Sequence, residues 1–204
     1  MQPVKAVLFE PVGCLAEFPA EPFNEIAARF FGGKRNATRS ASRAYWHVLN
    51  LMEASGRITD EFEAFEVEAV NGAVVFEDVA PALTELKAMG VQLCLTSSLS
   101  RAAVAAFLDR LPERDLFSAV WSRDSARGIK EAPLRAAVAS PDNTVFLTDT
   151  AEGLKTAMSA GLNGVLMMND PDEARRLAMQ NPAGGIVSLL ELPDFVRLVT
   201  ARNF

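Results

Sequence analysis

Five polar residues of this chain have the chemistry to act on a small charged molecule. Glu10, Thr96, Ser97 and Asp149 lie at the ends of short apolar runs, and Lys130 lies on a loop between two of those runs. A carboxylate can act as a nucleophile or as an acid–base group. Hydroxyl and ammonium groups can bind and stabilise anionic oxygen atoms. Together these residue types indicate the hydrolysis or the binding of a small anion.

The elements that must position these residues follow from the apolar pattern. Through most of the chain, short apolar runs alternate with segments of helical periodicity. A continuous run such as residues 5–9 is typical of a strand buried on both faces of a parallel sheet. We therefore predict an α/β fold with a doubly wound parallel sheet. In such sheets, ligands bind outside the carboxyl ends of the strands, where these residues would gather.

One part of the chain has a different pattern. Phe23, Ile26 and Phe30 recur at helical spacing, and a second helix is predicted from about Ser40. Residues 17–76 are therefore predicted to form a small all-helical insertion. Residues 1–16 together with 77–204 would form the main domain.

The order of the polar residues resembles a known family. The segment Val7–Leu15 reads as an apolar strand, an acidic residue, then Gly and Leu at fixed offsets. This pattern resembles the first motif of the haloacid dehalogenase-like (HAD) hydrolases. Thr96, Lys130 and Asp149 follow in the order of that superfamily's Thr or Ser, its Lys and its acidic motif. The resemblance covers essentially the whole chain, and it implies a HAD-like Rossmannoid core with the insertion as its helical cap.

The resemblance also implies roles for these residues. Glu10 would be the nucleophile, and Thr96 and Lys130 would be catalytic groups that neutralise charge on the transferred group. Thr96, Ser97 and Lys130 would bind the substrate. Mg²⁺, if it binds, would be held by Glu10, by the backbone carbonyl of Val12 and by Asp149.

The chain departs from the family's motifs at several of these points. Glu10 stands where the family has Asp, and Val12 stands where its phosphatases have the acid–base Asp. Thr148 replaces the Gly that precedes the acidic motif, and Gly153 stands where the last acidic residue would be. A displacement of the reacting group by about 1 Å can cost about 100-fold in rate. The loss of an acid–base group costs about 10²–10⁴-fold. We therefore expect any Mg²⁺ site to be weak or absent.

Two functional hypotheses follow. The first, which we favour at this point because several positions of one site are altered together, is a protein whose activity is lost or very weak. It would be retained as a small-anion-binding or regulatory module. The second is a working phosphatase-like or dehalogenase-like hydrolase in which Glu10 acts as nucleophile or general base. A small phosphorylated or carboxylate ligand fits both hypotheses.

The composition narrows the classes of partner. The 204 residues carry a net charge of −6, so we expect neither nucleic acid nor an anionic membrane as a partner. We find no apolar run of about 20 residues and no signal-peptide pattern. The two cysteines, Cys14 and Cys94, lie in or beside apolar strands, which favours a reducing cytoplasm. Apolar residues on the cap would make a homodimer unsurprising.

Two further residues are expected to have structural roles. Cys14 lies near a strand end but has no identifiable base partner, so a small buried apolar role is expected. His47, the only histidine, is expected to be a packed or half-exposed side chain of a cap helix.

Overall fold

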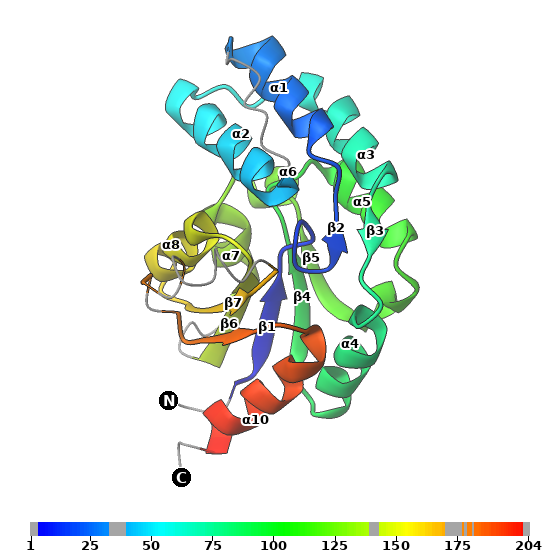
Figure 1. Cartoon of the computed structure of the whole chain (residues 1–204), viewed down its shortest axis with the longest axis vertical. Helices are drawn as coiled ribbons and strands as arrows, with labels where there is room; N and C mark the ends of the chain where they lie inside the picture. Colours follow the sequence, from blue (N-terminus) through cyan, green and yellow to red (C-terminus); the bar gives the residue numbers. More distant parts are fainter. Residues whose placement is uncertain are drawn as a thin grey trace.

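The computed structural model describes residues 4–32, 40–138, 143–169, 177, 179–180 and 182–201. Over these residues, the main sheet has six parallel strands in the order β5-β4-β1-β6-β7-β8 (Figure 1). The predicted doubly wound parallel sheet is confirmed. The strands are β1 (Ala6–Phe9), β4 (Gln92–Thr96), β5 (Phe117–Trp121), β6 (Thr144–Thr148), β7 (Asn163–Met167) and β8 (Gly184–Ile186).

Helices cover both faces of this sheet, which is why β1 is buried at every position. Val7 and Phe9 pack into the larger apolar cluster with residues of α4 and α10, whereas Leu8 packs on the opposite face with residues of α7 and α8. Within the described residues, no helix is long and apolar enough to cross a membrane. The helices of this domain are α4 (Val79–Ala88), α5 (Arg101–Asp109), η2 (Pro112–Leu116), α6 (Arg123–Ala126), α7 (Glu131–Ala137), α8 (Ala151–Ser159), η4 (Leu189–Glu191) and α10 (Leu192–Ala201).

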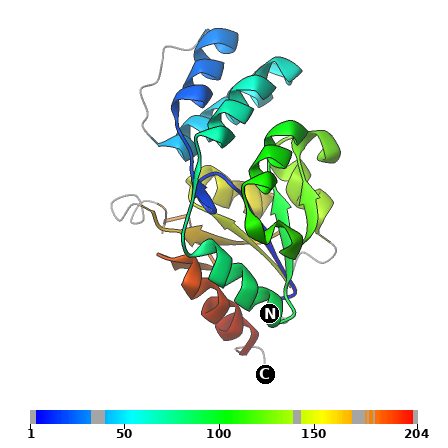
Figure 2. The same ribbon diagram turned by 90° about the vertical axis from the view of Figure 1, so that its right-hand side faces the viewer.

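The insertion forms a helical cap region at one end of the molecule, beyond the carboxyl ends of β1 and β4 (Figures 1 and 2). A two-stranded antiparallel ribbon of β2 and β3 carries the chain into and out of it. Ser40 caps the second cap helix by accepting a hydrogen bond from the Arg43 amide. The elements are β2 (Ala16–Glu17), α1 (Glu21–Phe31), α2 (Ala41–Ser55), η1 (Asp60–Phe62), α3 (Glu63–Asn71) and β3 (Val74–Val75).

Candidate active site

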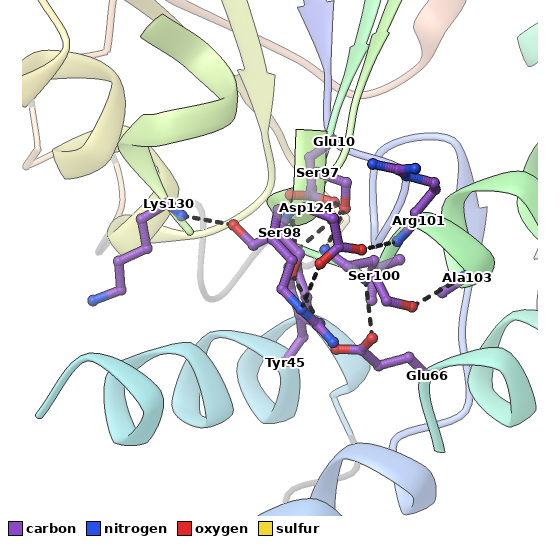
Figure 3. A network of polar contacts seen from close by, with 12 residues as sticks. Glu10, Tyr45, Glu66, Ser97, Ser98, Ser100, Arg101, Ala103, Asp124 and Lys130 are labelled. Carbon is purple, nitrogen blue, oxygen red and sulfur yellow. Dashed lines mark hydrogen bonds and ion pairs between the residues drawn. The ribbon is translucent and has the colours of Figure 1, made fainter. Parts of the chain in front are cut away.

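Glu10 is buried at the carboxyl end of β1, with only 4% of its surface exposed. The Ser97 hydroxyl group, which follows β4, donates a hydrogen bond to Glu10 Oε1 at 2.8 Å. The Tyr45 hydroxyl group, on the cap helix α2, donates to Glu10 Oε2 at 3.3 Å. Figure 3 shows these side chains converging between the sheet and the cap. The carboxyl group is thus enclosed by polar groups from two distant parts of the chain.

Tyr45 is a site residue that the sequence prediction missed. Its hydroxyl oxygen accepts a hydrogen bond from the Ser98 amide at 2.9 Å and lies 3.3 Å from Ser97 Oγ. Its ring packs 5.4 Å from the ring of Phe23, centroid to centroid. A tyrosine on the apolar face of a helix needs a partner for its hydroxyl group. Tyr45 is the only tyrosine of the chain, and its place on an apolar helix face could have indicated from the sequence that it hydrogen-bonds to a buried polar group.

Burial raises the pKa of both the Glu10 carboxyl group and the Tyr45 phenol. Loss of solvent raises the pKa of Glu10 to about 8, although hydrogen bonds from Ser97, Tyr45 and the Val12 amide oppose this rise. Glu10 is therefore mainly protonated at pH 7 in this closed arrangement. Burial, and then the charge of Glu10, raises the pKa of Tyr45 well above its ordinary value, so the phenol keeps its proton.

The residues after β4 shape one wall of the site. Ser97 Oγ accepts a hydrogen bond from the Leu99 amide at 3.2 Å, which fixes the hydroxyl group that faces Glu10. Ser98 Oγ accepts one from the Lys130 amide at 2.6 Å. Thr96 is buried, and its hydroxyl oxygen has no hydrogen-bond partner among the described residues. Ser97 is therefore the residue after β4 that hydrogen-bonds to Glu10. The catalytic and substrate-binding roles of Thr96 stay predictions.

Lys130 reaches the site with its backbone and turns its side chain elsewhere. Its ammonium group donates to Asn50 Oδ1 at 2.8 Å and to Glu53 Oε2 at 2.5 Å, both on α2. Figure 3 shows the side chain extending away from Glu10. The backbone of Lys130 has φ 56°, a conformation that residues other than glycine rarely adopt. In this arrangement Lys130 links the cap to the core, so its predicted catalytic and substrate-binding role requires the ammonium group to leave the cap.

Asp149 follows β6, and Ser97 follows β4, so the two residues lie on opposite sides of β1 and of the turn at Gly13 that follows it. Its Oδ2 atom accepts hydrogen bonds from Ser42 Oγ at 2.5 Å and from Asn169 Nδ2 at 3.4 Å. A Cβ atom at Gly13 would lie 2.1 Å from the same oxygen, so this turn, with φ +78° at Gly13, requires glycine. A cavity of about 160 Å³ lies beside Asp149 and is lined by Ser40, Ser42, Arg43, Asp149, Thr150, Met168, Asn169 and Leu177.

The Mg²⁺ site implied by the resemblance does not fit the groups that are present. Both Glu10 carboxyl oxygens accept hydrogen bonds from Ser97 and Tyr45, and Asp149 Oδ2 already accepts two hydrogen bonds. A Cβ atom at Gly153 would lie 1.9 Å from Thr148 Oγ1, so Thr148 fills the space that an acidic side chain at position 153 would need. No group of three or more His, Cys, Asp or Glu side chains comes together in the described part of the chain. Mg²⁺ is usually held by one or two carboxylate groups together with water, and in this closed arrangement the carboxyl groups of Glu10 and Asp149 are engaged in hydrogen bonds to other side chains.

A buried ion pair, also missed from the sequence, connects the cap to the core. Arg123 on α6 donates to Glu66 on α3, and both side chains are 2% exposed. Glu66 Oε2 also accepts the Ser100 amide at 3.0 Å, and Arg123 donates to the Ser98 carbonyl at 3.4 Å. The pair therefore holds the cap directly over the loop that carries Ser97.

Two other residues behave as expected. Cys14 is fully buried, its thiol donates to the Leu147 carbonyl at 3.6 Å, and burial raises its pKa well above the ordinary value. Such a thiol is inert. His47 is half-buried on α2.

Comparisons with known proteins agree with this fold. A family model described as haloacid dehalogenase-like hydrolase matches residues 20–167. Enolase-phosphatase E1 from Frankia alni is 34% identical over 116 residues, which make up 53% of this chain and 49% of that protein. The chain therefore spans about half the length of this curated relative.

Solved structures resemble the whole described fold. A phosphonoacetaldehyde hydrolase-like protein from Oleispira antarctica matches with a TM-score of 0.74 and 15% identity, over 98% of this chain and 94% of that one. L-2-haloacid dehalogenase from Xanthobacter autotrophicus, with chloropropionic acid covalently bound, matches with a TM-score of 0.64 and 18% identity, over 95% and 98% of the two chains. At these identities the likeness shows the fold, and it confirms the predicted Rossmannoid core with its cap.

Proposed function

Because this chain belongs to the haloacid dehalogenase-like hydrolase family, we propose that it is a hydrolase in which Glu10 is the reacting carboxylate. The observation that carries this proposal is the placement of Glu10. It lies at the end of the central strand and is hydrogen-bonded by Ser97 and Tyr45. The family match and the enolase-phosphatase relative favour a working hydrolase over a protein that has lost its activity.

Glu10 can take either of two roles in such a reaction. As a nucleophile it would form a covalent ester with the substrate, and as a general base it would activate a water molecule. Both roles require the ionised form, so activity is expected to rise with pH through the pKa of about 8. Trapping the enzyme during turnover and measuring its mass separates the roles, because only the nucleophile adds the mass of a substrate fragment to the peptide that contains Glu10.

Substrate entry requires the cap to move. Glu10, Ser97 and Tyr45 are each at most 4% exposed, so no substrate reaches the carboxyl group in the closed arrangement. We expect the cap to turn about the β2–β3 ribbon, which is the place where the chain enters and leaves it. The lining of the cavity of about 160 Å³ beside Asp149 does not include Glu10, so in the closed arrangement this cavity gives no access to the reacting group.

A second candidate is the small-anion-binding or regulatory module without catalysis. The observation that favours it is the set of altered motif positions, above all Thr148, whose side chain fills the space that a side chain at position 153 would need. This candidate predicts that ligands bind without turnover. It stays untested, and the comparisons support it less well than a working hydrolase.

One experiment separates the two candidates. The purified protein is incubated with a panel of phosphate esters, carboxylate esters and 2-haloacids, with and without Mg²⁺, and Glu10→Ala is run beside it. Turnover that Glu10→Ala abolishes supports the hydrolase. Turnover that persists in Glu10→Ala, or its complete absence from the panel, contradicts the proposed role of Glu10.

A further inference from the structure

The site lacks an acid–base group at the position where the resemblance places one. Val12 is fully buried and has no proton to transfer. A hydrolysis in which an oxygen atom leaves the substrate needs a proton for that oxygen, and supplying it contributes about 10²–10⁴-fold to the rate. Another group near Glu10 must supply this proton if the proposed hydrolase acts on such a substrate.

Tyr45 has the position that this role needs. Its hydroxyl group is 3.3 Å from Glu10 Oε2, and it projects from the cap toward the carboxyl end of β1 (Figure 3). The Ser98 amide donates to its oxygen at 2.9 Å, so a phenolate formed there would keep a backbone donor. Ser97 also touches Glu10, but an alcohol is a much weaker acid than a phenol, even though burial raises the pKa of Tyr45 above the ordinary phenol value of about 10.

We propose that Tyr45 is a catalytic residue that protonates an oxygen leaving group, in place of the acid–base residue missing at position 12. This inference rests on the proposed function of Glu10. It adds a substrate class, which comprises esters whose leaving group departs through oxygen. The electrophilic centre is phosphorus in a phosphate ester and carbon in a carboxylate ester.

The two chemical steps balance as follows. A Glu10 carboxylate oxygen bonds to the electrophilic centre while the bond to the leaving oxygen breaks, and that oxygen takes the Tyr45 proton. The phenolate that remains accepts a hydrogen bond from the Ser98 amide, and Glu10 is held as an acyl phosphate with a phosphate ester or as an acid anhydride with a carboxylate ester. Water then attacks the transferred phosphoryl or acyl group and gives a proton to the phenolate, which releases the product acid and restores both side chains.

The leaving group provides the test. Tyr45→Phe keeps the ring against Phe23 and removes only the hydroxyl group. Turnover by the wild type and the variant is compared on 4-nitrophenyl and phenyl phosphate, on 4-nitrophenyl and phenyl acetate, and on 2-chloropropionate. Phenolate is the poorer leaving group and needs the proton more. We expect kcat of Tyr45→Phe to fall about 100-fold or more on the phenyl ester and less than about tenfold on its 4-nitrophenyl partner. Chloride needs no proton, so any loss of 2-chloropropionate turnover should be no larger than the loss on the 4-nitrophenyl esters and should reflect only the missing hydrogen bond to Glu10.

A matched control separates proton transfer from packing. Phe23→Leu disturbs the same ring contact and leaves the hydroxyl group in place. It should lower kcat for phenyl and 4-nitrophenyl esters by the same factor. The acetate and phosphate arms show which electrophile the site accepts.

Three outcomes overturn the inference. Equal losses in Tyr45→Phe across the leaving groups would make Tyr45 a packing residue, and Glu10 would keep its proposed role. Turnover of 2-chloropropionate alone would exclude the substrate class, again without affecting Glu10. No wild-type turnover of any ester or haloacid would overturn both proposals.

If Tyr45→Phe does not fold, the solvent deuterium isotope effect on wild-type kcat replaces it. A larger effect with the phenyl ester than with the 4-nitrophenyl ester supports proton donation, and equal effects contradict it.

Discussion

The Thr148 hydroxyl oxygen lies 1.9 Å from the position that a Cβ atom at Gly153 would occupy. The two residues differ from the family's motif in opposite directions, since Thr148 adds a side chain where the family has Gly and Gly153 removes an acidic one. The added group fills the volume of the removed group. A single reversion at position 153 therefore cannot rebuild the acidic motif.

We predict that Gly153→Asp lowers the free energy of unfolding by about 1–3 kcal/mol, because the new side chain overfills a closely packed site. Thr148→Gly in the same chain should recover a large part of that loss. Urea denaturation of the two single variants and of the double variant measures how strongly the two positions depend on each other. Additive effects of the two substitutions on the free energy of unfolding would contradict the prediction that Thr148 fills the space needed at position 153.

Magnesium should have no specific effect on the wild-type protein. A ligand that binds only the folded state raises its stability by RT ln(1 + [L]/Kd), so millimolar Mg²⁺ would raise the Tm if a site were present. We expect no rise beyond that given by equal ionic strength of NaCl. The combined variant Glu10→Asp, Val12→Asp, Thr148→Gly and Gly153→Asp is expected to gain a Mg²⁺-dependent rise. A rise in the wild type that Asp149→Asn removes would show that the donor set does hold the metal.

Glu10 should make the protein less stable as the pH rises from about 4.5 to 8. Below this window the carboxyl group is protonated in both the folded and unfolded states, and above it the group is ionised in both. Within the window the unfolded chain releases a proton that the folded chain retains, so Glu10 lowers the free energy of unfolding by about 1.4 kcal/mol per pH unit. Glu10→Gln should remove this slope. Urea denaturation of both proteins across pH 5–8.5 measures it, and parallel curves would contradict the raised pKa.

The ion pair between Arg123 and Glu66 should be a major connection between cap and core. Arg123→Met leaves a buried carboxylate without its partner, and we expect it to lower the free energy of unfolding by about 3–5 kcal/mol. The double variant with Glu66→Met should lose much less than the two single losses added together. Thermal and urea unfolding of the three variants test this. Full additivity would mean that the two side chains do not act as a pair.

The strand ends of the site were predictable from the sequence, and the cap contacts were not. Apolar runs placed Glu10, Ser97 and Asp149 because parallel strands bring their carboxyl ends to one edge of the sheet. Tyr45 comes to Glu10 across 35 positions of sequence through the docking of a helix, and no local pattern encodes the angle of that docking. The same holds for Glu66 and Arg123, which are 57 positions apart.

Lys130 shows a different limit of sequence reasoning. Its place on the loop beside the site followed from the motif order, and its amide does contact Ser98. The direction of its side chain depends on an unusual backbone conformation and on Asn50 and Glu53 of the cap. None of these is visible in the motif itself.

The most direct test of this account is the pH dependence of turnover in the wild type, Glu10→Gln and Glu10→Ala, on whichever ester or haloacid of the panel the wild type hydrolyses. We predict that wild-type kcat/KM rises through the pKa of Glu10, at about pH 8, and that both variants lose turnover at every pH. Variants that retain wild-type turnover, or a wild type that turns over nothing between pH 6 and 10, would contradict the claim that Glu10 is the reacting carboxylate.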